Sequence, residues 1–293
     1  MQYGPDLRKL EEQLPGVTIG PLLGEGGYKM ALMAIINGIE EALKVVHIPH
    51  DPEDESVQDE NIRRLMREVR ILGSCESPFL VKLGSLSPKK LEIEGEILVV
   101  YSEEVLSGDS LRDRIRAGNR PDISELATTA CCCLDAIEEL WNVNVVHRDI
   151  KPDNLIRLGF IERPCVMLDL GVAFVVGGTP LTRDPRMLQG TRYYLAPEML
   201  EPDFRSNLDY RADMYALALT LYEYASGTNP FMLKQDAVYS TLQRIHSNTP
   251  QSLSELRPDL PSAFCRVVDQ LLRKRPALRP NISIVRKIRE ANL

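Results

Sequence analysis

The segment VVHRDIKPDNLI, residues 145–156, holds a dense group of charged and polar side chains between two apolar ends. Its central octet, 147–154, contains two carboxylates, three basic or imidazole groups and one amide. The apolar pairs at 145–146 and 155–156 are typical of short buried strands, which would fix the loop at both ends. Charge placed between buried supports is costly, so such a loop usually has a function. The alternative is an exposed loop whose Asp and Asn residues only form turns, which is the commonest fate of a polar octet.

Composition predicts a folded protein with a large apolar core. Of the 293 residues, 44% are hydrophobic and 26% are charged, which favours a compact two-lobed unit or two domains over disorder. The net charge of -7 argues against nucleic acid as the main partner, because phosphate backbones are bound by clustered Lys and Arg. No apolar run is long enough to cross a membrane, and the first residues lack the features of a signal peptide. We therefore expect a cytoplasmic protein with no membrane partner.

Hydrophobic patterns divide the chain into two regions. Residues 17–48 alternate short apolar runs with turns, which predicts three antiparallel strands with Asn37-Gly38 as a hairpin turn. Apolar residues at helical spacing predict a helix over 62–72, and further strands are expected at 80–86 and 96–101. The rest of the chain is mostly helical in pattern.

This asymmetry indicates two unequal lobes, joined near residues 103–107, with an active cleft between them. The cysteine triplet 131–133 does not suggest a metal site in the helical region. Consecutive residues on a helix point about 100° apart, so their thiols cannot converge on one ion. We expect these thiols to be buried in a helix.

The octet 147–154 resembles the catalytic loop of eukaryotic-type (Hanks-type) protein kinases. It matches the pattern HRD-x-K-x-x-N at every functional position. The resemblance implies that Asp149 orients the acceptor hydroxyl and takes its proton. It also implies that Lys151 stabilises charge on the transferred phosphoryl group and that Asn154 binds a metal ion.

Further segments resemble motifs of the same family, in the same order along the chain. GEGG at 24–27 is similar to the glycine-rich loop over the nucleotide phosphates, although Lys29 and Ala31 depart from the family pattern. Ala-Leu-Lys-Val at 42–45 is similar to the VAIK strand, and DLG at 169–171 is similar to the metal-binding DFG turn. The residues that these resemblances assign to the nucleotide and its metal are Gly24, Gly26, Gly27, Ala42, Lys44, Glu68, Glu104, Asn154 and Asp169.

Lys44 requires a carboxylate partner if it has a function. Glu68 lies on the apolar stripe of its predicted helix, and an inward-facing carboxylate should be paired with a cation. The resemblance implies a Lys44–Glu68 ion pair, and the helical spacing favours Glu68 over Glu60. The acidic residue of the segment between the lobes matches either Glu103 or Glu104.

Three later segments extend the resemblance. Residues 190–198 resemble the GT-x-x-Y-x-APE end of an activation segment. Asp213 matches the aspartate of the family's large central helix, and Arg279 matches the arginine that pairs with the APE glutamate, here Glu198. Thr179 and Thr182 are candidate sites of autophosphorylation.

The resemblance covers roughly residues 16–291 and implies the fold class. This class is α+β, a bilobal protein-kinase-like fold. Its N-lobe, 1–103, is expected to hold a five-stranded sheet and one αC-like helix, and its C-lobe, 104–293, is expected to be mostly helical. The GEGG-Y-K segment, residues 24–29, and the compact ending look most like the stand-alone bacterial-type members.

The implied activity is transfer of the ATP γ-phosphoryl group, with Mg²⁺, to serine or threonine hydroxyls of protein substrates. Lys151 and Thr191 favour serine and threonine over tyrosine. Two alternatives stay open: a pseudokinase that binds nucleotide and regulates partners, and a small-molecule phosphotransferase. The second normally lacks the segment that 190–198 resembles.

Overall fold

The computed structural model describes residues 4–26, 28–48, 55–169, 174–175, 192–204, 207–233, 237–283 and 285–286. These residues form two units. The first runs to Ser74 and resumes over Val81–Leu106, and the second takes Cys75–Leu80 and the described residues from Ser107 onward. The predicted division at 103/104 stays a prediction.

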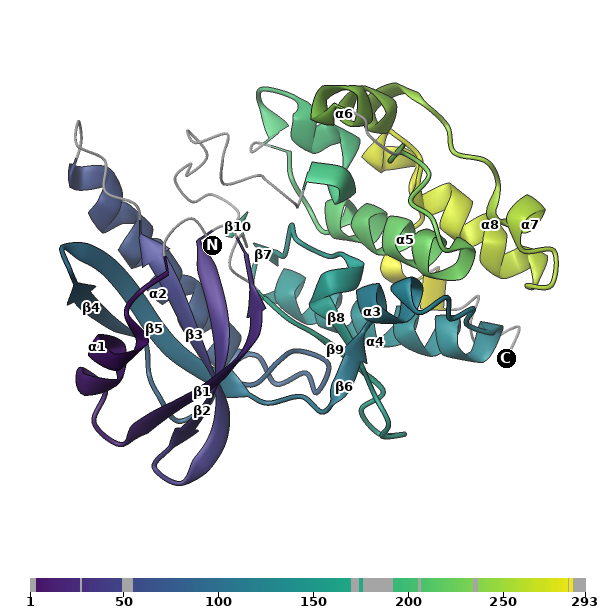
Figure 1. The fold of residues 1–293 in the computed structure, drawn as a ribbon. Helices are drawn as coiled ribbons and strands as arrows, with labels where there is room; N and C mark the ends of the chain where they lie inside the picture. The colour runs from purple at the N-terminus through teal and green to yellow at the C-terminus, as the bar shows by residue number, and fades with distance from the viewer. Residues whose placement is uncertain are drawn as a thin grey trace. The chain divides into compact units, whose positions relative to one another are not determined.

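An antiparallel sheet of five strands forms the first unit (Figure 1). The strands, in the spatial order β1-β2-β3-β5-β4, are β1 (Val17–Glu25), β2 (Lys29–Ile36), β3 (Ile39–Ile48), β5 (Glu96–Glu104) and β4 (Lys89–Ile93). The predicted three-stranded meander is confirmed. Asn37 and Gly38 join β2 to β3 with φ of 51° and 86°, the left-handed backbone of a two-residue hairpin turn.

The predicted strand at 80–86 is wrong. In this segment the backbone N–H groups of residues 84, 85 and 86 donate to the Ser102 carbonyl, the Glu41 carboxylate and the Ser102 hydroxyl. Side chains take two of these three donors, so the segment bonds to β5 without forming a regular strand ladder. The backbone at residue 84 lies so close to the Glu41 side chain that only glycine fits, because an added Cβ would overlap the Glu41 carboxylate.

Strand β4 follows this segment and pairs with β5 through a turn at Glu94 and Gly95. Both turn residues have positive φ, 55° and 82°. Glutamate seldom adopts this conformation, so the turn gave no clear signal in the sequence.

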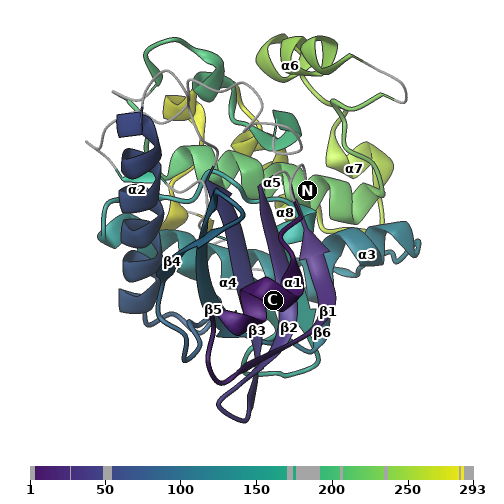
Figure 2. The same cartoon turned by 60° about the vertical axis from the view of Figure 1, so that its left-hand side comes forward.

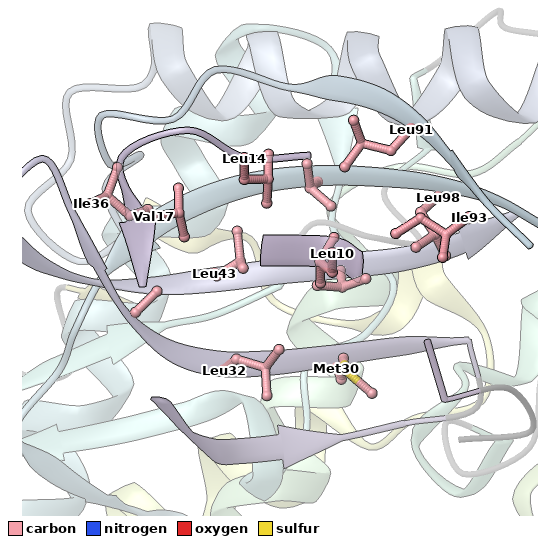
Figure 3. Close-up of a cluster of buried hydrophobic side chains, with 13 residues drawn as sticks. Leu10, Leu14, Val17, Met30, Leu32, Ile36, Leu43, Leu91, Ile93 and Leu98 are labelled. Atoms are coloured by element: carbon pink, nitrogen blue, oxygen red, sulfur yellow. The ribbon is translucent and has the colours of Figure 1, made fainter. Parts of the chain in front are cut away.

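Two helices pack on opposite faces of the sheet. Alternate residues of a strand point to opposite faces, and on β5 Leu98 joins one buried cluster while Val99 joins another. The first cluster includes Leu10 of α1 (Leu7–Glu12) (Figures 2 and 3). The second includes Leu65 of α2 (Glu55–Ser74).

Helix α1 is a second difference from expectation, since one helix was predicted in this lobe. Asp6 caps it by accepting a hydrogen bond from the backbone N–H of Arg8 at 2.9 Å. With only six residues, α1 is too short to show a helical period in the sequence.

The second unit is mostly helical. Its helices are α3 (Leu111–Arg116), α4 (Ile123–Asn142), α5 (Arg211–Ser226), α6 (Val238–Ser247), α7 (Leu253–Leu256) and α8 (Ser262–Leu271). Helix α5 is buried from Ala212 to Ala225 and packs against α3, α4, α7 and α8 (Figure 1). Cys132 and Cys133 are buried in α4.

Short strands complete this unit. They are β6 (Gly108–Ser110), β7 (Val145–Val146), β8 (Leu155–Leu158), β9 (Cys165–Met167) and β10 (Phe174–Val175). The predicted α+β class, with a β-rich N-terminal part and a mostly helical remainder, is confirmed. Among the helices that the structure describes, none combines the length and apolar character needed to cross a bilayer.

We predict that Leu10→Ala lowers the free energy of unfolding by about 2–5 kcal/mol, because it leaves a cavity in a closed apolar cluster. Leu10 is fully buried, whereas Leu7 on the same helix is 39% exposed. Leu7→Ala is therefore the control and should cost well under about 1 kcal/mol. Urea denaturation of both variants measures the difference, and equal losses would contradict the role given to α1.

Candidate active site

Buried strands hold the polar loop 147–154 at both ends. Strand β7 precedes it and β8 follows it, and Val145, Val146 and Leu155 are buried. Asp213 of α5 anchors the first two residues of the loop. Its two carboxylate oxygens accept the backbone N–H groups of His147 and Arg148, each at 2.8 Å.

The Asp213 carboxylate is almost completely removed from solvent. Its residue is only 1% exposed, and burial raises the pKa of the Asp213 carboxyl to about 7, against the two N–H donors that favour the ionised form. Arg148, which it anchors, has a φ of 68°. This backbone is unusual for a side chain of that size, and a firm anchor is needed to maintain it.

Asp149 is held by two other members of the loop. Its carboxylate oxygens lie 2.9 and 3.0 Å from Nζ of Lys151. The side-chain amide of Asn154 donates to the Asp149 carboxylate and to the Asp149 carbonyl, both at 2.8 Å. Asp149 is 3% exposed. The predicted catalytic residues Asp149, Lys151 and Asn154 are thus brought together, around one oriented carboxylate.

The end of β9 is bonded to the same loop. The backbone N–H of Leu168 donates to the carbonyl of Asn154 at 2.8 Å. Nδ1 of His147 accepts the N–H of Asp149 at 3.2 Å, so Nε2 carries the proton and donates it to the Leu168 carbonyl at 3.1 Å. These bonds place Asp169, the next residue, beside Asn154.

Asp169 and Asn154 provide oxygen atoms of the kind that Mg²⁺ prefers, a carboxylate and a side-chain amide. Asp169 has a φ of 69°, a second strained position at the end of this chain of bonds. These residue types are the ones that a magnesium site would use. Leu170 and Gly171 of the DLG motif lie outside the described residues.

Lys44 belongs to the first unit and is buried in β3, with 7% of the residue exposed. Its Nζ lies 3.3 Å from Oε2 of Glu103 on β5, a contact that was not foreseen. Glu68 is buried on α2, 5% exposed, and α2 packs on the sheet face toward which Lys44 points. The Lys44–Glu68 pair stays a prediction.

The two candidate glutamates, Glu103 and Glu104, have different neighbours in the structure. Ala42 lies opposite Glu103. Glu104 bonds to Lys82 twice: its N–H donates to the Lys82 carbonyl at 2.9 Å, and its carboxylate accepts the Lys82 N–H at 2.7 Å.

The glycine-rich turn lies between β1 and β2. An added Cβ at Gly24 would meet no atom within 4 Å, so the fold itself does not require glycine there. At Gly26 the backbone N–H donates to the Lys29 carbonyl at 2.7 Å. Gly27 lies outside the described residues.

Two polar clusters hold residues of 190–198, the segment that resembles the end of an activation segment. The guanidinium of Arg279 forms a double hydrogen bond with Glu198, at 2.6 and 2.7 Å, which confirms this predicted pair. Arg112 of α3 bonds to Glu223 of α5 and to the Tyr194 hydroxyl, which in turn donates to Glu223.

Arg112 also contacts Asp153 of the polar loop at 3.2 Å. Sequence patterns missed this cluster, since its members lie far apart in the chain. Three residues named for the activation segment lie outside the described part of the chain, namely Thr179, Thr182 and Thr191.

Comparison with known proteins gives a consistent result. A sequence model of the protein kinase domain matches residues 17–289. The chain is 27% identical over 259 residues to the serine/threonine-protein kinase PrkC of Bacillus subtilis, covering 87% of this chain and 37% of that protein.

Two further relatives are similarly distant. Identity is 28% over 272 residues with the serine/threonine-protein kinase PknE of Mycobacterium bovis, covering 90% of this chain and 44% of PknE. It is 27% over 276 residues with the dual specificity mitogen-activated protein kinase kinase jkk-1 of Caenorhabditis elegans, covering 90% and 58%. The chain therefore spans less than two thirds of the length of each relative.

The pKa of Asp213 predicts a pH dependence of stability. Aspartate in an unfolded chain titrates near about 3.9, well below the value of about 7 in the folded chain. The folded chain thus binds more protons between these values. The contribution of Asp213 to stability is fully present below the lower value and is lost as the pH rises through the upper one.

We expect the free energy of unfolding of the wild type, minus that of Asp213→Asn, to fall as the pH is raised from about 5 to about 8. Urea denaturation over this range measures it. Asp109→Asn, which changes an exposed carboxylate of the same unit, is the control and should show no such trend. A constant difference for Asp213→Asn would contradict the raised pKa.

Proposed function

The chain belongs to the protein kinase family, and from that premise we propose that it transfers the γ-phosphoryl group of ATP to serine and threonine hydroxyls of protein substrates. The observation that carries the proposal is the buried Asp149 carboxylate, held by Lys151 and Asn154 beside the strand end that bears Asp169. Protein substrates agree with the names of the relatives.

Phosphoryl transfer requires positioning and charge neutralisation more than covalent chemistry from the protein. The acceptor oxygen forms a bond to the γ-phosphorus as the bond between that phosphorus and the ADP oxygen breaks. In the proposed mechanism Asp149 orients the acceptor hydroxyl and takes its proton. Lys151, already in contact with Asp149, stabilises the negative charge on the phosphoryl oxygens.

The remaining predicted residues bind the nucleotide. Asn154 and Asp169 would hold Mg²⁺, which when bound neutralises charge on the phosphates. Lys44 would hold the phosphates while Glu68 orients it. Backbone groups of the glycine-rich turn would approach the phosphate oxygens, and Ala42 and Glu104 would lie next to the base.

Several finer predictions accompany this proposal. They are a division into lobes at 103/104, autophosphorylation at Thr179 or Thr182, action in the cytoplasm, and the absence of membrane and nucleic-acid partners. Lys151 supports serine and threonine as acceptors by resemblance.

We predict that Asp149→Asn lowers the rate of transfer by about 100-fold or more, because an amide cannot accept the proton. Mg²⁺-ATP affinity should be nearly unchanged. The rate is measured with labelled ATP and a general protein acceptor, and affinity by calorimetry, with the exposed Asp109→Asn as a control that keeps both.

Full transfer by Asp149→Asn would refute the role of Asp149. Two other outcomes support the alternatives. A wild-type chain that binds ATP without transfer would indicate a regulatory pseudokinase, and transfer only to small molecules would indicate a small-molecule phosphotransferase.

Gly24→Ala tests the nucleotide turn. Since the added methyl group has open space around it, the free energy of unfolding should change by less than about 1 kcal/mol. Affinity for Mg²⁺-ATP should fall several-fold, because backbone groups approach phosphate most closely without a side chain. Gly159→Ala has equally open space and serves as the control in the second unit. Unchanged ATP affinity in Gly24→Ala would remove this turn from the site.

A further inference from the structure

Lys44 and Glu103 form a buried ion pair within the sheet of the first unit. Their charged atoms lie 3.3 Å apart, and the side chains are 9% and 3% exposed. In the register of β3 and β5, Ala42 is opposite Glu103 and Lys44 is opposite Tyr101. Glu103 is therefore the diagonal neighbour of Lys44 on the same face of the sheet.

The location of the pair makes it geometrically rigid. Both residues belong to adjacent, hydrogen-bonded strands, and the residues between them on the two strands, Leu43 and Ser102, are fully buried. A buried ammonium is costly unless a carboxylate compensates it, and removal of either partner leaves an uncompensated charge. Glu103 lies on the strand next to β3, so it can pair with Lys44 whatever the position of helix α2.

We propose that Glu103 is a positioning residue, which holds the ammonium group of Lys44 where it binds the nucleotide phosphates. This inference rests on the proposed function, since it assumes that Lys44 contacts ATP. It differs from the Lys44–Glu68 pair in that the carboxylate belongs to the sheet and not to a helix. Glu103 acts through Lys44 and does not itself touch the transferred group.

A double-mutant cycle on stability tests the pair without reference to activity. The variants are Glu103→Gln, Lys44→Met and the double substitution, compared by urea denaturation. We expect a coupling of about tenfold or more in the unfolding equilibrium constant, as for buried charges in contact. The coupling should persist in a Glu68→Gln background.

Glu104→Gln is the matched control, because the Glu104 carboxylate bonds to the Lys82 N–H and should show little coupling to Lys44→Met. Effects of Glu103→Gln and Lys44→Met that simply add would overturn the inference, whether or not the chain is active.

Measurements of nucleotide binding test the positioning role of Glu103. Glu103→Gln should weaken Mg²⁺-ATP affinity about tenfold, with the KM for ATP raised more than kcat is lowered, and Glu103→Asp should recover part of the loss. Coupling without a change in ATP affinity would overturn the role, since the pair would then support only the sheet. A wild-type chain that does not bind ATP would contradict the proposed function, and the stability cycle would still decide whether Glu103 holds Lys44.

Discussion

The buried carboxylate of Asp213 is the interaction on which the rest of the site depends. It accepts two consecutive backbone N–H groups of the polar loop and lies on a helix that is buried over most of its length. Because the loop is anchored through its backbone, its side chains remain available to bind one another and the substrates. Asp149 then bonds to Asn154, and Asn154 bonds through Leu168 to the strand end at Asp169. One fixed point in the helical core thereby positions the Asp149 carboxylate and the backbone that leads to Asp169.

Largely buried ion pairs occur in both units, and each joins segments that lie apart in the chain. Arg279 and Glu198 hold the end of the activation region, and Lys44 and Glu103 join two strands. Such pairs add little net stability, because desolvation cancels much of their attraction, yet losing one partner is costly. Their main contribution is to fix the positions of the charged side chains. Phosphoryl transfer depends on the placement of charge, so ion pairs that fix charged side chains suit that chemistry.

Much of the fold and of the catalytic loop could be predicted from the sequence, because the signals are local. The octet 147–154 carries its residues in one short segment, and the Asn37-Gly38 turn matches a known backbone conformation. The position of strand β4 and the presence of helix α1 could not be predicted, since the strand is joined by an unusual Glu94 turn and the helix is short. The Lys44–Glu103 pair depends on strand register, and the cluster around Arg112 joins distant segments. Neither has a local pattern to reveal it.

The most direct test of the account is metal-dependent transfer by the whole chain. Wild type and Asp169→Ala are incubated with γ-labelled ATP, Mg²⁺ and a general protein acceptor, and the labelled amino acids are then identified. The account predicts phosphoserine and phosphothreonine with the wild type and almost no label with Asp169→Ala, because the carboxylate that would hold the metal is gone. Equal labelling by the two proteins would contradict it.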